Sequence, residues 1–253
     1  MENRPVVAFG ASTDVGLMRN ENQDAYGVFA ASPDEHTSHK GQLFVVADGM
    51  GGHKGGKQAS ELAVKIIGET YSADADKSVL ESLANALQAA NEAVYRASLR
   101  SSALSGMGTT CVALVVRGNH VHVAHIGDSR VYRVTKAEII QLTRDHTAVA
   151  EMQRRGIITA EEAKYHPERS VLYRALGTES VAEIEVQPEI VVTATEWFVL
   201  CSDGLTNMVE DADIQDVVIS HPPQEACETL VGLANERGGV DNITVIVVQI
   251  SEP

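Results

Sequence analysis

The segment Phe44-Val45-Val46-Ala47-Asp48-Gly49 decides how this chain is organised, because an apolar run ends abruptly in a carboxylate and a glycine. A short apolar run bounded by a turn signal is typical of a strand that is buried on both faces. Residues 49–56 are rich in glycine, which lets the backbone approach a ligand closely. Residues 58–71 follow, with apolar side chains at the spacing of a helix lying on a core. The segment therefore predicts a buried strand, a ligand-lining loop and a covering helix.

The rest of the chain repeats these patterns. Strands are predicted over residues 6–11, 25–30, 43–47, 109–116, 120–126, 131–134, 198–201 and 243–250, and further helices over 79–99, 212–220 and 224–236. Most strands follow one another through short connections rather than crossover helices, which favours antiparallel pairing over a doubly wound parallel sheet. We therefore expect an α+β domain in which antiparallel sheets are covered by helices.

No linker or repeat divides the 253 residues, so we expect residues 1–253 to form a single domain. Residues 147–177 are polar and charged, and a long, weakly hydrophobic insertion of this kind is usually a functional loop or a disordered one. We interpret it as a flap, with a plain surface loop as the alternative. Within it, Thr159 and Glu162 have the spacing of a capping box for a short helix.

The net charge and the cysteine pattern exclude some classes of function and indicate a cellular compartment. The net charge of −15 disfavours binding to nucleic acid or to an anionic membrane. The three cysteines are scattered through apolar segments and form no Cys-x-x-Cys pair, which predicts reduced thiols in a cytoplasmic protein. The first residues lack a basic region followed by a long apolar run, and no apolar stretch approaches the length of a membrane span, so we expect neither a signal peptide nor a membrane-spanning helix.

Four aspartates stand at the ends of strands that look central: Asp48, Asp128, Asp203 and Asp241. Each one alone is explained by turn chemistry, because Asp-Gly is a common hairpin dipeptide. Together they are harder to explain, since a carboxylate at the end of a buried strand must be paired or bound to a metal. Strand ends can converge at one edge, where oxygen ligands would suit Mg²⁺, Mn²⁺ or Ca²⁺ rather than Zn²⁺.

Two further residues extend this pattern near the N-terminus. Asp24 opens the strand predicted at residues 25–30, much as Asp241 opens the last strand. Arg19 lies five residues earlier, and its planar guanidinium matches two oxygens of a phosphate group. A surface arginine is the ordinary explanation, but the neighbouring acidic pattern favours an anion-binding role.

Seven sequence blocks occur in an order that resembles a known family. They are RNENQDA (19–25), VVADGMGGHKGG (45–56), GMGTT (106–110), HIGDSRVYR (125–133), LTRDHT (142–147), SDGL (202–205) and GGVDNITVIVV (238–248). This ordered set is similar to the metal-dependent serine/threonine protein phosphatases of the type 2C or PPM family, in their bacterial single-domain form. The resemblance spans nearly the whole chain. It implies a four-layer α-β-β-α sandwich, with two antiparallel sheets flanked by helix pairs.

The resemblance also implies a metal set of two core Mn²⁺ or Mg²⁺ ions and a third, weaker one. By analogy Asp48 bridges the two core ions, the carbonyl of Gly49 binds the second, and Asp203 and Asp241 complete the first. Asp24 is expected to contact the metals directly or through water molecules.

Other positions are implied to act at the substrate or at the third ion. Asp128 resembles the aspartate that holds the weaker ion together with Asp203, and Arg19 resembles the residue that grips the substrate phosphate. Met50 stands where eukaryotic members carry a histidine proposed as general acid, so His53 is the nearest candidate in this chain. A metal-bound water is the alternative proton donor.

We therefore expect hydrolysis of phosphoserine and phosphothreonine on proteins by a metal-activated water. Expected partners are phosphoproteins, including a cognate serine/threonine kinase, and the chain is expected to be a monomer. Three alternatives stay open: a sensor or binding domain with little turnover, a small-molecule phosphoesterase, and a structural calcium protein. The complete set of aspartates argues against the first, whereas the sequence does not decode substrate choice.

Overall fold

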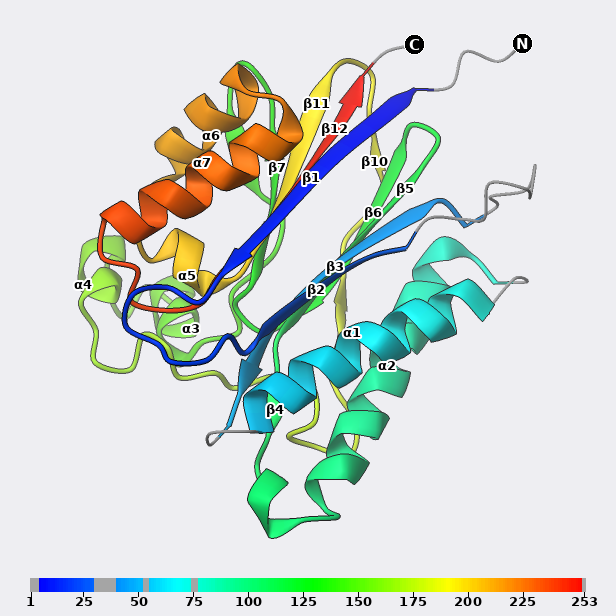
Figure 1. The fold of residues 1–253 in the computed structure, drawn as a ribbon, viewed down its shortest axis with the longest axis vertical. Helices are drawn as coiled ribbons and strands as arrows, with labels where there is room; N and C mark the ends of the chain where they lie inside the picture. Colours follow the sequence, from blue (N-terminus) through cyan, green and yellow to red (C-terminus); the bar gives the residue numbers. More distant parts are fainter. Residues whose placement is uncertain (1–4, 30–39, 52–54, 74–76, 252–253) are drawn as a thin grey trace.

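A computed structural model describes residues 5–29, 40–51, 55–73 and 77–251, and it shows two β-sheets packed between two pairs of helices (Figure 1). All strand pairs within the two sheets are antiparallel. The four-layer α-β-β-α sandwich expected from the sequence is therefore confirmed. At one end of the sandwich, several strands of both sheets begin or end close together.

The first sheet has the strand order β1-β12-β11-β7-β8. These strands are β1 Val6–Asp14, β12 Ile243–Ser251, β11 Glu196–Cys201, β7 Arg130–Val134 and β8 Ile139–Gln141. The second sheet has the order β10-β6-β5-β3-β2, with β4 paired to β3 and β9 paired to β6. These strands are β10 Ile190–Val191, β6 His120–Ile126, β5 Cys111–Arg117, β3 Gln42–Met50, β2 Asp24–Phe29, β4 Gly108–Thr109 and β9 Glu185–Val186.

Each sheet carries a helix pair on its outer face (Figure 1). Helices α1 Gly55–Ala73 and α2 Val79–Ser98 cover the second sheet, and α6 Asp211–Ser220 and α7 Pro223–Glu236 cover the first. The shorter helices are α3 Ala148–Arg154, α4 Ala160–Lys164, α5 Asp203–Thr206 and the 3₁₀ turn Ser102–Leu104. Within the described ranges, no helix has both the length and the apolar character that crossing a bilayer requires.

Side-chain alternation along β3 explains how a carboxylate comes to lie between the sheets. Phe44 and Val46 pack into the core between the two sheets, whereas Val45 and Ala47 pack against α1 and α2. Because alternate residues of a strand share a face, Asp48 continues the inner face beyond Val46. The buried strand predicted at residues 43–47 is thus confirmed, and its inner face ends in a charge.

The facing sheet ends in the same way. Leu200 of β11 and Ile246 of β12 lie in the core between the sheets. Two residues further toward the common end, the same faces present Ser202 and Thr244, both fully buried. The apolar interior therefore gives way to polar groups at one end of the sandwich, and it does so in both sheets.

Several boundaries differ from the sequence expectation. The strand predicted at residues 109–116 is divided into β4 and β5 at Thr110, whose N–H donates to the carbonyl of Asp48 instead of continuing the β4 pairing. Ala30, the last residue of the strand predicted at 25–30, lies outside the described residues. Strands β8, β9 and β10 and helix α5 were not predicted, because elements of two to four residues carry too little periodicity.

The residues that begin α4 and α7 are those that the sequence predicted. Pro223 stands at the first turn of α7, as the proline pair predicts. The capping box in the flap is also confirmed, because the Thr159 hydroxyl accepts the N–H of Glu162 while the Glu162 carboxylate accepts the N–H of Thr159. A second capping box, formed by Ser78 and Glu81, begins α2. Local hydrogen bonds therefore begin these helices at the expected residues.

Candidate metal centre

Five carboxylates meet at the polar end of the sandwich. The pKa of Asp48 is raised well above its usual range, first by burial and then by the charges of Asp24, Asp203, Asp128 and Asp241. Carboxylates shift one another's pKa in this way only when they lie close together. Asp24 and Asp48 are direct neighbours in the β2–β3 ladder. The structure thus brings together the strand-end aspartates that the sequence singled out.

Asp24 connects the two sheets. Its Oδ2 atom accepts hydrogen bonds from the hydroxyls of Ser202 and Thr244, each at 2.7 Å, although Asp24 belongs to the other sheet. Its Oδ1 atom is buried and has no hydrogen-bond partner. Burial raises the pKa of Asp24 to about 6, against the two hydroxyl hydrogen bonds, which lower it. One oxygen is therefore fixed by the protein while the other is left for a ligand.

Asp203 and Asp241 are held by side chains from other elements. Asp203 lies in the first turn of α5, and its Oδ2 accepts the amide of Asn207 at 3.0 Å. Asp241 lies in the loop before β12, and its Oδ2 accepts Nη2 of Arg19 at 2.7 Å. Burial, followed by the charge of Asp241, raises the pKa of Asp203. Both carboxylates are thus oriented but remain partly exposed.

Asp128 lies in the turn between β6 and β7, and that turn is tied to the Asp48 strand. Gly127 has a φ of +101°, and a Cβ atom there would lie 2.6 Å from Thr110. The hydroxyls of Ser129 and Thr110 are 2.7 Å apart, and the Thr110 hydroxyl accepts the N–H of Asp48 at 3.0 Å. The position of Asp128 is therefore set relative to Asp48 through one hydroxyl pair.

The charge balance of the cluster fits a divalent cation. Burial, followed by the charges of Asp203 and Asp145, raises the pKa of Asp128 to about 8. At neutral pH these carboxylates cannot all be ionised unless positive charge is supplied. The partnerless Oδ1 of Asp24 and the all-oxygen donor set suit a hard cation such as Mg²⁺ or Mn²⁺.

The sequence and the fold are both similar to those of known proteins. A profile of the family described as "Protein phosphatase 2C" matches residues 19–231. The chain belongs to the protein phosphatase 2C family. It is 37% identical over 248 residues to protein phosphatase PhpP of Streptococcus pneumoniae, covering 95% of this chain and 96% of the relative.

Solved structures of bacterial serine/threonine phosphatases share the whole fold. Serine/threonine phosphatase Stp1 from Staphylococcus aureus superposes with a TM-score of 0.90 at 30% identity, covering 99% of this chain and 98% of that one. The catalytic domain of the phosphatase PstP, in complex with two manganese ions, gives a TM-score of 0.83 at 33% identity, covering 98% and 100%. The family resemblance inferred from the seven blocks is therefore confirmed.

Arg19 lies at the edge of this phosphatase 2C centre rather than inside it. Its side chain is 56% exposed, and it pairs with Asp241. The pKa of Arg19 is raised, first by its hydrogen bond and charge interaction with Asp241, with smaller contributions from Asp48 and Asp203. An exposed guanidinium beside the carboxylates is placed to meet an anion that approaches from solvent.

Gly49 is packed against the start of α1 too tightly for any side chain. A Cβ atom there would lie 2.1 Å from the carbonyl oxygen of Gly56 and 2.6 Å from that of Gln23. The N–H of Gly49 donates to the same Gln23 carbonyl at 3.2 Å. The glycine-rich loop therefore brings backbone next to backbone at the metal centre, and the role of the Gly49 carbonyl stays a prediction.

The predictions for the general acid and for the flap are not tested by the structure. His53 lies outside the described residues. The segment predicted as a flap contains α3 and α4, and its ends form single β-bridges, Thr147 to Leu172 and Thr109 to Leu176. Exposed apolar residues occur along it, among them Ile157 and Tyr165. Its function as a flap stays a prediction, as do the roles assigned above to the individual site residues.

Residues that sequence reasoning missed are those that hold the carboxylates. Ser202 and Thr244 lie in quoted family blocks but received no role, because a hydroxyl gives no pattern of its own. Asn242 was missed too, although its amide donates to the carbonyls of Val15 and Glu21 and its Oδ1 accepts the N–H of Gln23. It thereby holds the loop that carries Arg19 in place.

A fourth supporting residue is Asp145. Its carboxylate accepts three hydrogen bonds from the guanidinium of Arg130, between 2.7 and 3.2 Å. Arg130 follows Asp128 by two residues, so this pair braces the same turn. Only the LTRDHT block could have indicated it.

The cysteines are not candidates for a nucleophile. Cys111, Cys201 and Cys227 are all free and buried. Burial raises the pKa of Cys201 and of Cys227 to about 12 and that of Cys111 further, so none forms a thiolate readily at neutral pH. Covalent thiol chemistry is thereby disfavoured at this centre.

Proposed function

We propose that this chain hydrolyses phosphoserine and phosphothreonine esters on proteins at the carboxylate cluster. The observation that carries the proposal is the convergence of five aspartates from separate elements, with the guanidinium of Arg19 beside them. The family and its named relatives, which are serine/threonine phosphatases, support the same reaction class.

In this proposal Asp24, Asp48, Asp203, Asp241 and the Gly49 carbonyl hold two Mn²⁺ or Mg²⁺ ions, as the two manganese ions of the related PstP domain suggest. Asp128 and Asp203 hold a third ion more weakly. When bound, the cations supply charge neutralisation and Lewis-acid activation of water and of the phosphoryl oxygens.

The protein's own groups orient this chemistry. The hydroxyls of Ser202 and Thr244 fix one oxygen of Asp24 and direct the other into the centre. On substrate binding, Arg19 releases Asp241 and donates to two oxygens of the substrate phosphate, because a planar guanidinium binds such a pair in a bidentate manner. His53 or a water molecule protonates the departing serine or threonine oxygen.

We further propose that residues 1–253 form one catalytic domain with a substrate-facing flap at 147–177. Phosphoproteins are the substrates, including a cognate serine/threonine kinase, and the chain acts in signalling as a cytoplasmic monomer. Three buried, unpaired cysteines support a reducing compartment. The exposed apolar residues of the flap support a protein rather than a small-molecule substrate.

The test is phosphate release from a phosphothreonine peptide in the presence of Mn²⁺. We expect turnover that EDTA abolishes and that Asp48→Ala lowers by more than roughly 100-fold, since losing a direct ligand should exceed the usual effect of losing a supporting group. Trp197→Phe, which lies on the helix-facing side of β11, serves as a control that should retain activity. Faster release from nucleotides than from peptides would instead indicate a small-molecule phosphoesterase. Absence of turnover with Mn²⁺ bound would indicate a binding domain.

A further inference from the structure

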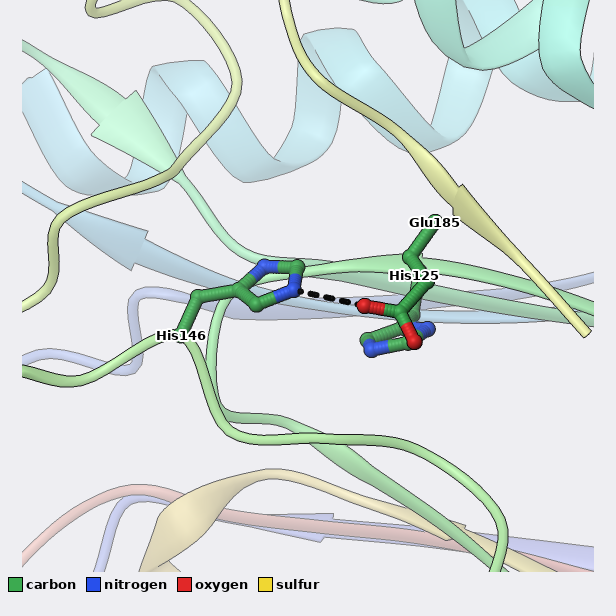
Figure 2. A group of neighbouring side chains, drawn as sticks. All are labelled: His125, His146 and Glu185. Carbon is green, nitrogen blue, oxygen red and sulfur yellow. Dashed lines mark hydrogen bonds and ion pairs between the residues drawn. The ribbon is translucent and has the colours of Figure 1, made fainter. Parts of the chain in front are cut away.

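A pair formed by a buried histidine, His146, and a partly exposed carboxylate, Glu185, lies next to the turn that carries Asp128. Nε2 of His146 is 3.3 Å from Oε2 of Glu185, and the ring of His125 stacks on that of His146 with centroids 5.0 Å apart (Figure 2). His146 directly precedes the flap, and Glu185 lies on β9, after it. The mechanism proposed above uses neither residue.

His146 makes hydrogen bonds to both backbone polar groups of Gly127. The ring atom Nδ1 of His146 accepts the N–H of Gly127 at 3.1 Å, and the backbone N–H of His146 donates to the Gly127 carbonyl at 3.0 Å. Gly127 has a positive φ, and because glycine can adopt many backbone conformations, hydrogen bonds help to hold it in this one. Asp128 is the next residue, so a change in the backbone of Gly127 would move the point from which its carboxylate extends.

The hydrogen bonds also fix the tautomer of His146. Because Nδ1 accepts from Gly127, the proton of the neutral ring is on Nε2, where Oε2 of Glu185 accepts it. Oε1 of Glu185 accepts the side-chain amide of Gln187 at 3.2 Å, which orients the carboxylate. A carboxylate that fixes the tautomer and orientation of a histidine is the arrangement found behind many metal sites.

We propose that His146, whose ring is held by the hydrogen bond to Glu185, is a positioning residue. It directs the carboxylate of Asp128 toward the third cation and couples that direction to the position of the flap. This inference rests on the proposed function, because the aim of Asp128 matters only when cations bind.

The link to the flap comes from its two ends. The N–H of Tyr173 donates to the carbonyl of His146 at 2.9 Å, and the two rings lie 5.6 Å apart. On the other side, the hydroxyl of Thr147 accepts the N–H of Ala150 and so caps α3 directly after His146. A shift of either flap end therefore reaches Gly127 through one residue, His146, by its backbone and by its ring.

A zinc site is the alternative for these three side chains. One ligand atom from each of His125, His146 and Glu185 can be chosen so that all three lie within 4.8 Å of one another, and two histidines with a glutamate can bind Zn²⁺. However, Nε2 of His146 would have to lose its proton while Nδ1 already accepts a backbone N–H. The hydrogen-bonded arrangement is therefore favoured, and zinc binding becomes an outcome of the test.

The first measurement uses the metal-free protein. We expect ¹⁵N NMR of the His146 ring to show a protonated Nε2 and an unprotonated Nδ1. Amide hydrogen exchange of Gly127 should accelerate at least roughly tenfold in Glu185→Ala and in His146→Ala. His146→Asn should restore part of the protection, because its side-chain oxygen can accept the Gly127 N–H. Glu189→Ala is the matched control, since it removes a carboxylate from His120 and His122 of the same sheet without reaching the turn.

The second measurement counts bound Mn²⁺ by electron paramagnetic resonance. We expect Glu185→Ala to weaken the third ion roughly 10- to 100-fold while the two core ions and the peptide KM are unchanged. Unaltered Gly127 exchange, an Nδ1-protonated ring, equal loss of all three ions, or Zn²⁺ binding that Glu185→Ala removes would each overturn the proposal. Inactivity of the wild-type protein would instead contradict the proposed function, because the NMR readouts do not require turnover.

Discussion

Gly49 illustrates how single residues constrain this centre, because an added Cβ would meet the carbonyl oxygens of Gly56 and Gln23 at 2.1 and 2.6 Å. Both obstacles are backbone atoms, so neither can rotate away. We expect Gly49→Ala to lower the free energy of unfolding by roughly 1–3 kcal/mol, the usual range for overpacking.

The matched control is Gly232→Ala. Gly232 lies on the exposed side of α7 with nothing within 4 Å of the added Cβ. There the substitution should stabilise the protein by about 0.5–1 kcal/mol, because alanine loses less entropy than glycine in a helix. Urea denaturation of both variants tests the pair, and equal effects at the two positions would contradict the packing argument.

Also at the residue scale, the sequence indicated which carboxylates matter but not what holds them. Asp48 and Asp203 stood out because a charge follows an apolar run, which is visible in one dimension. Ser202 and Thr244 did not stand out, because their partner Asp24 lies about 180 and 220 positions away. Such hydrogen bonds become visible only when the two sheets face each other.

At the scale of elements, β12 supports the centre from the opposite sheet. The Thr244 hydroxyl of β12 and the Ser202 hydroxyl after β11 both donate to Oδ2 of Asp24 on β2. We expect Thr244→Val to weaken binding of a core Mn²⁺ ion roughly tenfold, the lower end of the usual loss when a supporting hydrogen bond is removed. Calorimetric titration with Mn²⁺ measures this.

The double variant sharpens that prediction. Residues in one hydrogen-bond network are not additive, so Thr244→Val with Ser202→Ala should weaken Mn²⁺ binding by an amount different from the product of the single effects. Strict additivity would show that the two hydroxyls do not share Asp24 in solution. No change in any variant would show that Asp24 does not act at the cations.

The elements themselves were predictable where apolar residues were numerous. Buried strands such as β3 and β12 and the paired helices followed from their apolar periodicity, and the Thr159–Glu162 capping box predicted the start of α4. Helix α5 was missed because Asp203 looked like a turn after a strand, whereas it opens a short helix. A four-residue element is decided by tertiary contacts rather than by its own sequence.

At the scale of the whole molecule, the carboxylate cluster makes stability depend on pH and metal. In the metal-free protein Asp128 keeps its proton up to about pH 8 in the folded state, whereas it releases it near pH 4 when unfolded. The folded state then binds more protons, so the free energy of unfolding should fall as pH rises between about 6.5 and 8. Below that window the buried histidines make the free energy of unfolding rise with pH, because burial lowers the pKa of His125 to about 4 and the unfolded state then binds more protons.

Thermal denaturation across this pH window checks the effect. Mn²⁺ should abolish the decline, because cations stabilise the ionised carboxylates, and Asp128→Asn should reduce it without metal. A stability that rises between pH 6.5 and 8 in the absence of metal would contradict the proximity of these charges.

The layered architecture of the whole chain was within reach of the sequence, because short connections imply antiparallel sheets and paired helices need a face to cover. The sequence did not predict that the inner faces of both sheets change from apolar to polar at the same end. It depends on the relative register of two sheets, which alternation within one strand does not specify.

The most direct test of the account is anomalous diffraction from crystals soaked in Mn²⁺. We predict two strong peaks beside Asp48, within coordination distance of Asp203 and Asp241, and a weaker one beside Asp128. Peaks elsewhere, or none while these aspartates keep their present positions, would contradict the claim that divalent cations hold the cluster together.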